Sequence, residues 1–228
     1  MSEISISVDL RWRFGPVRNQ GSRPTCLAFA ASDTHAALRP GWVPLSCEFA
    51  FHHAQRRAGR PPDQGAMLSS MLEALRHDGQ PEEAGWPYLA RLPADLRTWL
   101  PPPTVGATFR RNGHMAAASI AAVLQSLNLG RPVVLLLHLS ASFYRVRPDG
   151  IVEPAPGEAP ETQRRHAVIA LAHGSVRGET AVLVRNSWGE RWAAGGYAWL
   201  TERFLAPRLF AAALLAEEVD VPGRPDAT

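Results

Sequence analysis

The chain has 228 residues, of which 46% are hydrophobic and 20% are charged, and its formal net charge is +3. This length can bury a substantial core as one large domain or two lobes, and the balance of residue types excludes broad disorder. All 24 basic residues are arginines and they are scattered along the chain, so the sequence does not indicate a nucleic-acid-binding surface.

The cysteine content and the N-terminal residues point to one compartment. Only two cysteines occur, Cys26 and Cys47, which fits a reducing compartment better than a disulfide-bonded secreted protein. Residues 1–9 contain neither the basic nor the apolar segment of a signal peptide, and the longest apolar runs, 133–137 and 210–216, are too short to cross a membrane. We therefore expect a cytoplasmic protein without membrane contact.

The first hundred residues carry mainly helical patterns. Residues 4–8 alternate isoleucine or valine with serine, which predicts a short strand. Capping residues and helical spacing of apolar residues then predict three helices, at 25–37 after the N-cap Thr25, from Ser46 to 53 with a stop near Gly59, and at 67–75.

The pattern changes after the three prolines at 101–103, which are the best candidate for a linker. Beyond them one helix is expected at 119–127, and apolar runs predict strands at 133–139, 167–172, 181–185 and 196–200. Helices followed by strands indicate an α+β protein with two segregated lobes.

Cys26 lies where a helix should begin. The turn sequence Asn19-Gln20-Gly21-Ser22 precedes it, and good helix formers follow it. A thiol in the first turn of a helix is exposed to unpaired backbone N–H groups and to the positive end of the helix dipole, which both stabilise a thiolate. Cys26 is therefore a candidate nucleophile, with a small buried hydrophobe as the ordinary alternative.

Two residues far from Cys26 in the sequence complete a candidate catalytic set. His166 follows a polar turn and enters an apolar run, and Asn186 ends another apolar run just before Ser187 and Trp188. A cysteine, a histidine and an asparagine that are distant in sequence can meet in the fold as nucleophile, base and orienting residue. Taken singly, the histidine could equally be a core residue and the asparagine part of an ordinary turn.

With these motifs the chain resembles the papain-like cysteine peptidases. The similarity is carried by Gln20-Gly21 before Cys26, by Ala28-Phe29 after it, by His166-Ala167-Val168, and by Asn186-Ser187-Trp188-Gly189 with Trp192 and Gly196-Tyr197 beyond. Order and spacing agree as well as residue type, and the resemblance covers about residues 8–205. It implies an α+β papain-like two-lobe fold, in which a helical lobe with the nucleophile helix packs against an antiparallel, β-barrel-like lobe and the active-site cleft lies between them.

The resemblance also implies a division of the chain. Residues 1–228 would form a single peptidase domain, with a mainly helical lobe at 9–103, a mainly β lobe at 104–218 to which the strand at 1–8 pairs, and a tail at 219–228. Papain-like peptidases generally carry an inhibitory propeptide before the mature enzyme. Because the similarity to a mature start begins at residue 8, we expect no covalent inhibitor here.

Each matching residue takes an implied role. Cys26 would attack the substrate carbonyl, His166 would accept the thiol proton and later protonate the leaving amine, and Asn186 would hold the imidazole ring. Gln20 would donate to the oxyanion together with the backbone N–H of Cys26, and Trp188 would shield the contact between His166 and Asn186. Neither a metal nor another cofactor is implied, and Cys47 is expected to be a core residue.

The substrate-binding residues rest on counting without gaps from Gly79 against the family's pattern. The resulting candidates are Gly65, Ala66, Met67, Leu68, Leu136 and Ala167. The first two would run beside the substrate backbone, where the methyl group of Ala66 puts close docking in question. The others would line an apolar pocket, which predicts a preference for an apolar side chain two residues before the cut.

One departure from the family pattern adds charge beside the histidine. The residue before His166 is Arg165, and a nearby cation disfavours imidazolium unless the arginine points away or pairs with Glu161. We therefore expect a weaker thiolate–imidazolium pair and a narrower or more alkaline pH–activity profile. An alternative role of Arg164 and Arg165 is to attract acidic residues on the far side of the cut.

The function expected from these residues is peptide-bond hydrolysis through a thioester acyl-enzyme, on a peptide or protein substrate. Narrow specificity, or a regulatory or substrate-delivering partner protein, would replace the propeptide. Two alternatives stay open. One is an amide or isopeptide hydrolase or acyl-transferase acting on a modified product, and the other is a catalytically idle binding module, against which the occupation of all four catalytic positions argues.

Overall fold

The computed structural model describes residues 3–147 and 149–219, and its contacts divide the chain into two compact units. The first unit comprises residues 1–21 and 115–214, and the second comprises residues 22–114 and 215–228. Helices dominate the second unit and strands the first, so the protein is α+β, as expected from the sequence. No helix within the described residues is long and apolar enough to cross a membrane.

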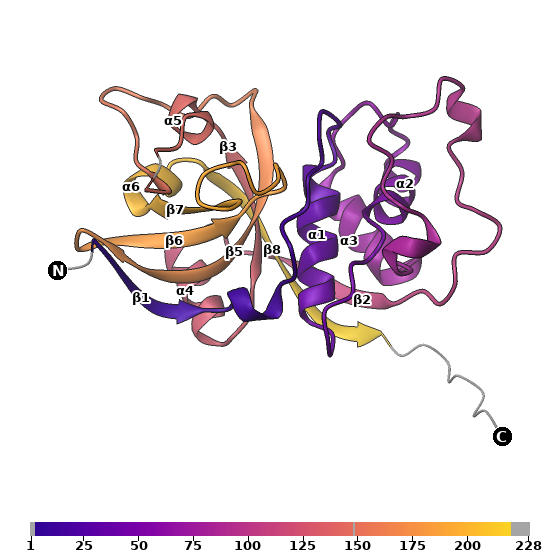
Figure 1. Ribbon diagram of the computed structural model, residues 1–228, viewed down its shortest axis with the longest axis horizontal. Coiled ribbons are helices and arrows are strands. Elements are labelled where there is room, and N and C mark those ends of the chain that lie inside the picture. The colour runs from indigo at the N-terminus through magenta and orange to yellow at the C-terminus, as the bar shows by residue number, and fades with distance from the viewer. Residues whose placement is uncertain (1–2, 148, 220–228) are drawn as a thin grey trace. The chain divides into compact units, whose positions relative to one another are not determined.

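Three helices form the core of the second unit (Figure 1). They are α1 (Cys26–Ala37), α2 (Cys47–Ala58) and α3 (Leu68–His77), and they pack against one another. Every residue of α1 after Cys26 is buried, α2 is exposed only at Arg56 and Arg57 in its last turn, and α3 keeps an exposed polar face. The three predicted helices are confirmed, with ends shifted by a few residues. Two short 3-10 turns follow, η2 (Glu83–Gly85) and η3 (Leu96–Thr98).

The helix ends follow local rules only in part. The hydroxyl of Ser46 accepts the backbone N–H of Phe49 at the start of α2, and Gly59 ends this helix with a φ of 60°. Thr25 precedes α1, as predicted, but its side chain makes no capping hydrogen bond. Its hydroxyl lies instead 2.9 Å from that of Tyr88, so a tertiary contact takes the place of the local cap.

An antiparallel sheet organises the first unit (Figure 1). Its strands lie in the order β8 (Leu209–Val219), β3 (Val133–His138), β5 (Arg165–Val176), β6 (Glu179–Arg185) and β7 (Tyr197–Thr201), with the short β4 (Ile151–Val152) parallel to β7 at the edge and β1 (Ile4–Asp9) paired with β5. The helix α4 (Ile120–Asn128) packs on β3 and β5, and the single-turn helices α5 (Ala141–Tyr144) and α6 (Glu202–Leu205) join the strands. The buried β3 and β5 form the centre of this core.

Besides the two-residue β4, two strands lie where no strand is predicted. The strand β8 covers the apolar run at 210–216, which is too short and too uniform for its periodicity to reveal its structure. The other, β2 (Arg110–Ala116), has polar residues of low strand propensity and lies beside β8 in the strand order. Its Arg111 is buried and donates to the backbone oxygen of Ala216 at 2.6 Å, a contact that becomes visible only in the fold.

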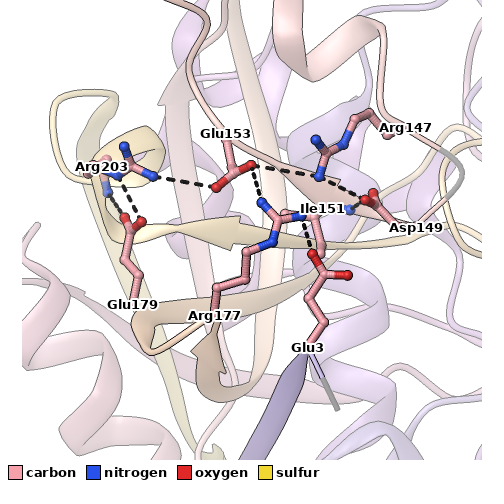
Figure 2. Close-up of polar contacts among 8 residues, drawn as sticks. All are labelled: Glu3, Arg147, Asp149, Ile151, Glu153, Arg177, Glu179 and Arg203. Carbon is pink, nitrogen blue, oxygen red and sulfur yellow. Dashed lines mark hydrogen bonds and ion pairs between the residues drawn. The ribbon is translucent and has the colours of Figure 1, made fainter. Parts of the chain in front are cut away.

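A network of ion pairs lies around β4 and the neighbouring segments of the first unit (Figure 2). Glu153, just after β4, lies 3.0 Å from Arg177 and 3.4 Å from Arg203. Arg147 approaches the same carboxylate at 3.7 Å, and Arg177 also pairs with Glu3. The carboxylate of Glu153 therefore connects Arg177, in the turn between β5 and β6, with Arg203 in α6. Through Arg177 the network also reaches Glu3, just before β1.

Candidate active site

His166 and Asn186 meet at the ends of two neighbouring strands of the first unit. The Nε2 atom of His166, in β5, lies 2.6 Å from Oδ1 of Asn186, which directly follows β6. The same Oδ1 atom accepts the backbone N–H of Ser187 at 2.8 Å, which identifies it as the amide oxygen. His166 must therefore donate through Nε2–H, and its Nδ1 atom carries the lone pair that can accept a proton.

Burial determines the charge of this imidazole. His166 is only 6% exposed, and burial lowers the pKa of its ring to about 4, opposed by the hydrogen bond to Asn186. The guanidinium of Arg165 lies over the ring of Phe210, 5.7 Å from its centroid, which is the case in which no weakening of the ion pair is expected. The pH–activity profile itself stays a prediction. The imidazole is neutral at pH 7 unless an anion is placed beside it.

Aromatic side chains surround the contact between His166 and Asn186. The ring of Trp188 lies 4.6 Å from the imidazole, and Phe143 approaches both edge-on, at 5.9 Å from His166 and 5.5 Å from Trp188. Tyr144 stacks on Trp188 at 5.5 Å. Phe143 and Tyr144 are not identified from the sequence, because they lie in the single-turn α5 with no motif around them. These rings exclude water from the hydrogen bond and fix the plane of the imidazole.

Gln20 lies beside the residue that follows Asn186. Its backbone N–H donates to the carbonyl oxygen of Ser187 at 2.8 Å, and its Oε1 accepts the hydroxyl of Ser187 at 2.6 Å. Gln20 is 6% exposed, which argues against a turn glutamine in solvent. Because the hydroxyl of Ser187 fixes the position of Oε1, the Nε2 group of the same amide points away from Ser187. Ser187 therefore orients the proposed oxyanion donor, a role that its place in the motif alone does not reveal.

Cys26 belongs to the second unit, where it is the first residue of α1 and half-buried. This is the expected position in the first turn of a helix, where the dipole favours a thiolate. Cys47, in α2, is 1% exposed and fits the expected core residue. Both cysteines are thiols.

A buried ion pair anchors the loop before Cys26. Nη1 and Nη2 of Arg23 lie 2.6 and 3.0 Å from the two carboxylate oxygens of Glu48 in the first turn of α2. The carboxylate also accepts the indole N–H of Trp99 at 2.6 Å and the backbone N–H of Leu89 at 3.0 Å. The side chains of Arg23 and Glu48 are 5% and 0% exposed. The loop that leads to Cys26 is thus bound to α2 and to the segment around residue 89.

The first four candidate substrate residues lie at the start of α3. Gly65 and Ala66 precede the helix in irregular backbone, Met67 is its N-cap and Leu68 its first residue. A side chain at Gly65 would lie 3.9 Å from the carbonyl oxygen of Pro24, two residues before the thiol. Met67 is 48% exposed. Within the second unit, Gly65 therefore lies beside the loop that leads to Cys26.

The remaining two candidates are paired in the sheet of the first unit. Leu136 in β3 is the register partner of Ala167 in β5, and Ala211 of β8 lies on the other side of Leu136. Leu136 is half-buried, whereas Ala167 is only 2% exposed. Side chains alternate along a strand, so Ala167 faces the side of the sheet opposite to His166. Leu136 is thus the more accessible wall of the two.

A metal site has no support in the part of the chain that the structure describes. No group of three or more His, Cys, Asp or Glu side chains is placed there to hold a metal ion. His52 of α2 contacts Trp86 and Trp99, and burial lowers its pKa to about 4, so it packs as an aromatic core residue. The neighbouring His53 is half-buried, contacts Phe49 and lies 3.3 Å from Asp78.

Residues 54–205 match the model of the papain family cysteine proteases. This region contains His166 and Asn186 and begins after Cys26. A cysteine protease of Blomia tropicalis is 27% identical over 200 residues, covering 82% of this chain and 58% of the relative. Pro-cathepsin H of Bos taurus is 27% identical over 192 residues, covering 82% of this chain and 56% of the relative. The chain thus spans little more than half the length of these curated relatives.

The fold has a close counterpart among solved structures. Xylellain, a cysteine protease from Xylella fastidiosa, superposes with a TM-score of 0.73 over 92% of this chain and 86% of its own, at 21% identity. At this identity the similarity establishes the fold alone. It agrees with the papain-like α+β fold expected from the sequence.

Proposed function

The chain belongs to the papain family of cysteine proteases, and on this premise we propose that it is a cysteine peptidase. The observation that carries the proposal is the tautomer of His166. Asn186 accepts from Nε2–H, so that Nδ1 is the atom available to take a proton from a thiol. Cys26, at the positive end of α1, is the proposed source of that proton.

The proposed reaction has two halves. In the first, the thiolate of Cys26 attacks the substrate carbonyl, Gln20 donates to the oxyanion, and imidazolium at His166 protonates the leaving amine as the thioester forms. In the second, His166 takes a proton from water, which attacks the thioester and releases the acid and the thiol. Asn186 keeps its hydrogen bond to Nε2–H throughout and so holds the ring in place for both transfers.

The lowered pKa of His166 sets the condition under which an ion pair can form. Burial alone keeps His166 neutral, with a pKa of about 4, so imidazolium requires an opposite charge nearby. A thiolate at Cys26 would supply that charge and raise the pKa of the ring. We therefore propose that the two groups ionise together, and that replacement of Cys26 by serine leaves His166 neutral over the whole working pH range.

Labelling with a thiol-reactive epoxide tests this function, combined with hydrolysis of a fluorogenic peptide library. We expect selective adduction at Cys26 and hydrolysis that favours an apolar residue two positions before the cut. Because the chain has two cysteines, C47S is the matched control: it should keep both signals, whereas C26S should lose both. A folded wild-type protein that neither labels at Cys26 nor cleaves any peptide would refute the proposal.

We also propose that the enzyme works in a reducing compartment, with narrow specificity or a partner protein that delivers the substrate. Two thiols in 228 residues support this, since a disulfide framework is the usual sign of an oxidising compartment. Fractionation of cells that express the full-length protein tests the location. Recovery from the medium or from a vesicular fraction would refute it.

A further inference from the structure

Arg185 is the last residue of β6, directly before Asn186, and it is almost completely buried. Only 1% of the residue is exposed. A buried guanidinium loses its hydration and must find its hydrogen bonds within the protein. Its partners therefore indicate what this side chain holds in place.

The guanidinium binds two consecutive carbonyl oxygens of the N-terminal segment. Nη1 donates to the oxygen of Gly15 at 2.8 Å, and Nη2 donates to the oxygen of Pro16 at 2.5 Å. Nη1 also lies 2.8 Å from the hydroxyl of Tyr197, and the guanidinium carbon lies 5.6 Å from the ring centroid of Phe14. The planar fork of an arginine can reach two neighbouring carbonyls at once, which an ammonium group does less well.

This segment leads to Gln20 and has little regular structure of its own. Residues 14–18 lie between the 3-10 turn η1 (Arg11–Arg13) and Gln20, and they belong to no strand or helix. The segment is partly exposed, and because it lies outside a sheet, its backbone carbonyls depend on side chains or water for their hydrogen bonds. The segment also packs closely on the loop before β7, because a side chain at Gly196 would overlap with Val17. Arg185 thus supplies two hydrogen bonds of the kind that a neighbouring strand would otherwise donate.

Arg185 and the two residues that follow β6 bind different parts of the site. Arg185 holds the segment before Gln20, and Ser187 binds Gln20 itself. Asn186 binds His166. The strand end therefore connects the orientation of the base with the position of the oxyanion donor.

We propose that Arg185 is a positioning residue for the reaction, which acts by holding the segment that carries Gln20. This rests on the proposed function, because Gln20 has a catalytic role only if the chain is a cysteine peptidase. Loss of Arg185 should impair stabilisation of the oxyanion while leaving the thiolate and the imidazole unaffected. A donor displaced by about 1 Å can cost up to about 100-fold in rate.

The test uses R185M, which keeps much of the side chain's apolar bulk and removes its donors, with Y197F as the matched control. The Tyr197 hydroxyl contacts the same guanidinium but neither Gly15 nor Pro16. Two rates are measured on each protein: peptide hydrolysis, with kcat and KM separately, and alkylation of Cys26 by iodoacetamide, which needs the thiolate but forms no oxyanion. We expect kcat of R185M to fall about 10- to 100-fold with little change in KM or in alkylation, and Y197F to resemble the wild type.

A double-variant cycle shows through which residue Arg185 acts. In the Q20A background, R185M should lower kcat little further, because the group that it positions is already absent. Two outcomes overturn the inference: R185M with the kcat of the wild type, or a full additional loss in the Q20A background. Equal losses of hydrolysis and alkylation would also overturn it, since they mean general damage to the site.

Two further results keep the interpretation unambiguous. If R185M does not fold, R185K takes its place; it keeps the charge but not the planar fork, and a smaller loss of kcat is expected. Unchanged kcat in R185K, with R185M unfolded, counts against the inference. Failure of the proposed function looks different, because then the wild type itself neither hydrolyses peptides nor alkylates selectively at Cys26.

Discussion

Removal of the guanidinium of Arg23 should destabilise the second unit strongly. In R23M, the carboxylate of Glu48 keeps its N–H donors from Leu89 and Trp99 and loses the two from Arg23, together with the positive charge that pairs with it. The carboxylate has no access to water, because its side chain is 0% exposed. A buried charge left in this way costs about 3–5 kcal/mol of the free energy of unfolding.

The double variant R23M/E48Q separates the charge from the packing. Glutamine at position 48 removes the buried charge and keeps an oxygen that can accept from Trp99 or Leu89. Since a buried ion pair can often be replaced by neutral groups of similar volume at little cost, the double variant should recover most of the stability. E48Q alone should again be destabilised by about 3–5 kcal/mol, because it leaves the guanidinium of Arg23 buried without its carboxylate.

Urea unfolding followed by tryptophan fluorescence measures these differences, since Trp99 contacts the carboxylate directly. The matched control is R57M. Arg57 lies on the same helix as Glu48 and pairs with Asp78 at 2.6 Å, but their side chains are 34% and 21% exposed, so its loss should cost less than about 1 kcal/mol. The reasoning is refuted if R23M loses no more stability than R57M, or if the double variant is as unstable as the sum of the single ones.

Three other changes test separate parts of the account. N186A removes the acceptor of His166 Nε2–H, a hydrogen bond that raises the pKa of the imidazole ring. The NMR titration of His166 should therefore shift to lower pH in N186A, and kcat should fall. An unchanged titration would contradict the assigned contact. Burial lowers the pKa of His35 to about 3, so that below about pH 6.5 the unfolded chain binds a proton that the folded chain does not. The contribution of His35 to the free energy of unfolding is therefore full above about pH 6.5 and is lost as the pH falls toward 3. In urea titrations at several pH values, H35Q should reduce the slope of stability against pH by up to about 1.4 kcal/mol per pH unit. E153Q should lower Tm at low salt, and the difference from the wild type should shrink near 1 M NaCl, where screening acts within about 3 Å; a difference independent of salt would assign the effect to packing.

Local sequence signals predict the helices because each signal lies within the helix itself. The hydroxyl of Ser46 and the left-handed Gly59 mark the two ends of α2, and apolar spacing marks the buried face of α3. Thr25 shows the limit of such signals. Its identity predicts a cap, yet its hydroxyl contacts Tyr88, 63 residues away, and no local rule can reveal that choice. The strand β8 is missed for a related reason, because an unbroken apolar run fits a buried strand and a buried helix equally well.

The residues of the candidate site also differ in whether a local sequence signal identifies them. Gln20, His166 and Asn186 can be found because a motif surrounds each of them. Phe143 cannot, since it contacts His166 from a single-turn helix without a motif. Arg165 shows that adjacency in the sequence does not fix a contact, because alternation along β5 directs its guanidinium toward Phe210.

The buried arginines could not be recognised from composition, and together they explain how irregular segments carry this site. Arg23 donates to the backbone oxygen of Leu89, and Arg185 to those of Gly15 and Pro16. In both cases a guanidinium satisfies the carbonyls of a segment outside the helices and strands, because its five donors fan out in one plane. Segments held in this way need no regular structure of their own. The loop before Cys26 and the segment before Gln20 are therefore held by these arginines, and substitution of Arg23 or Arg185 should loosen them before it disturbs the strands.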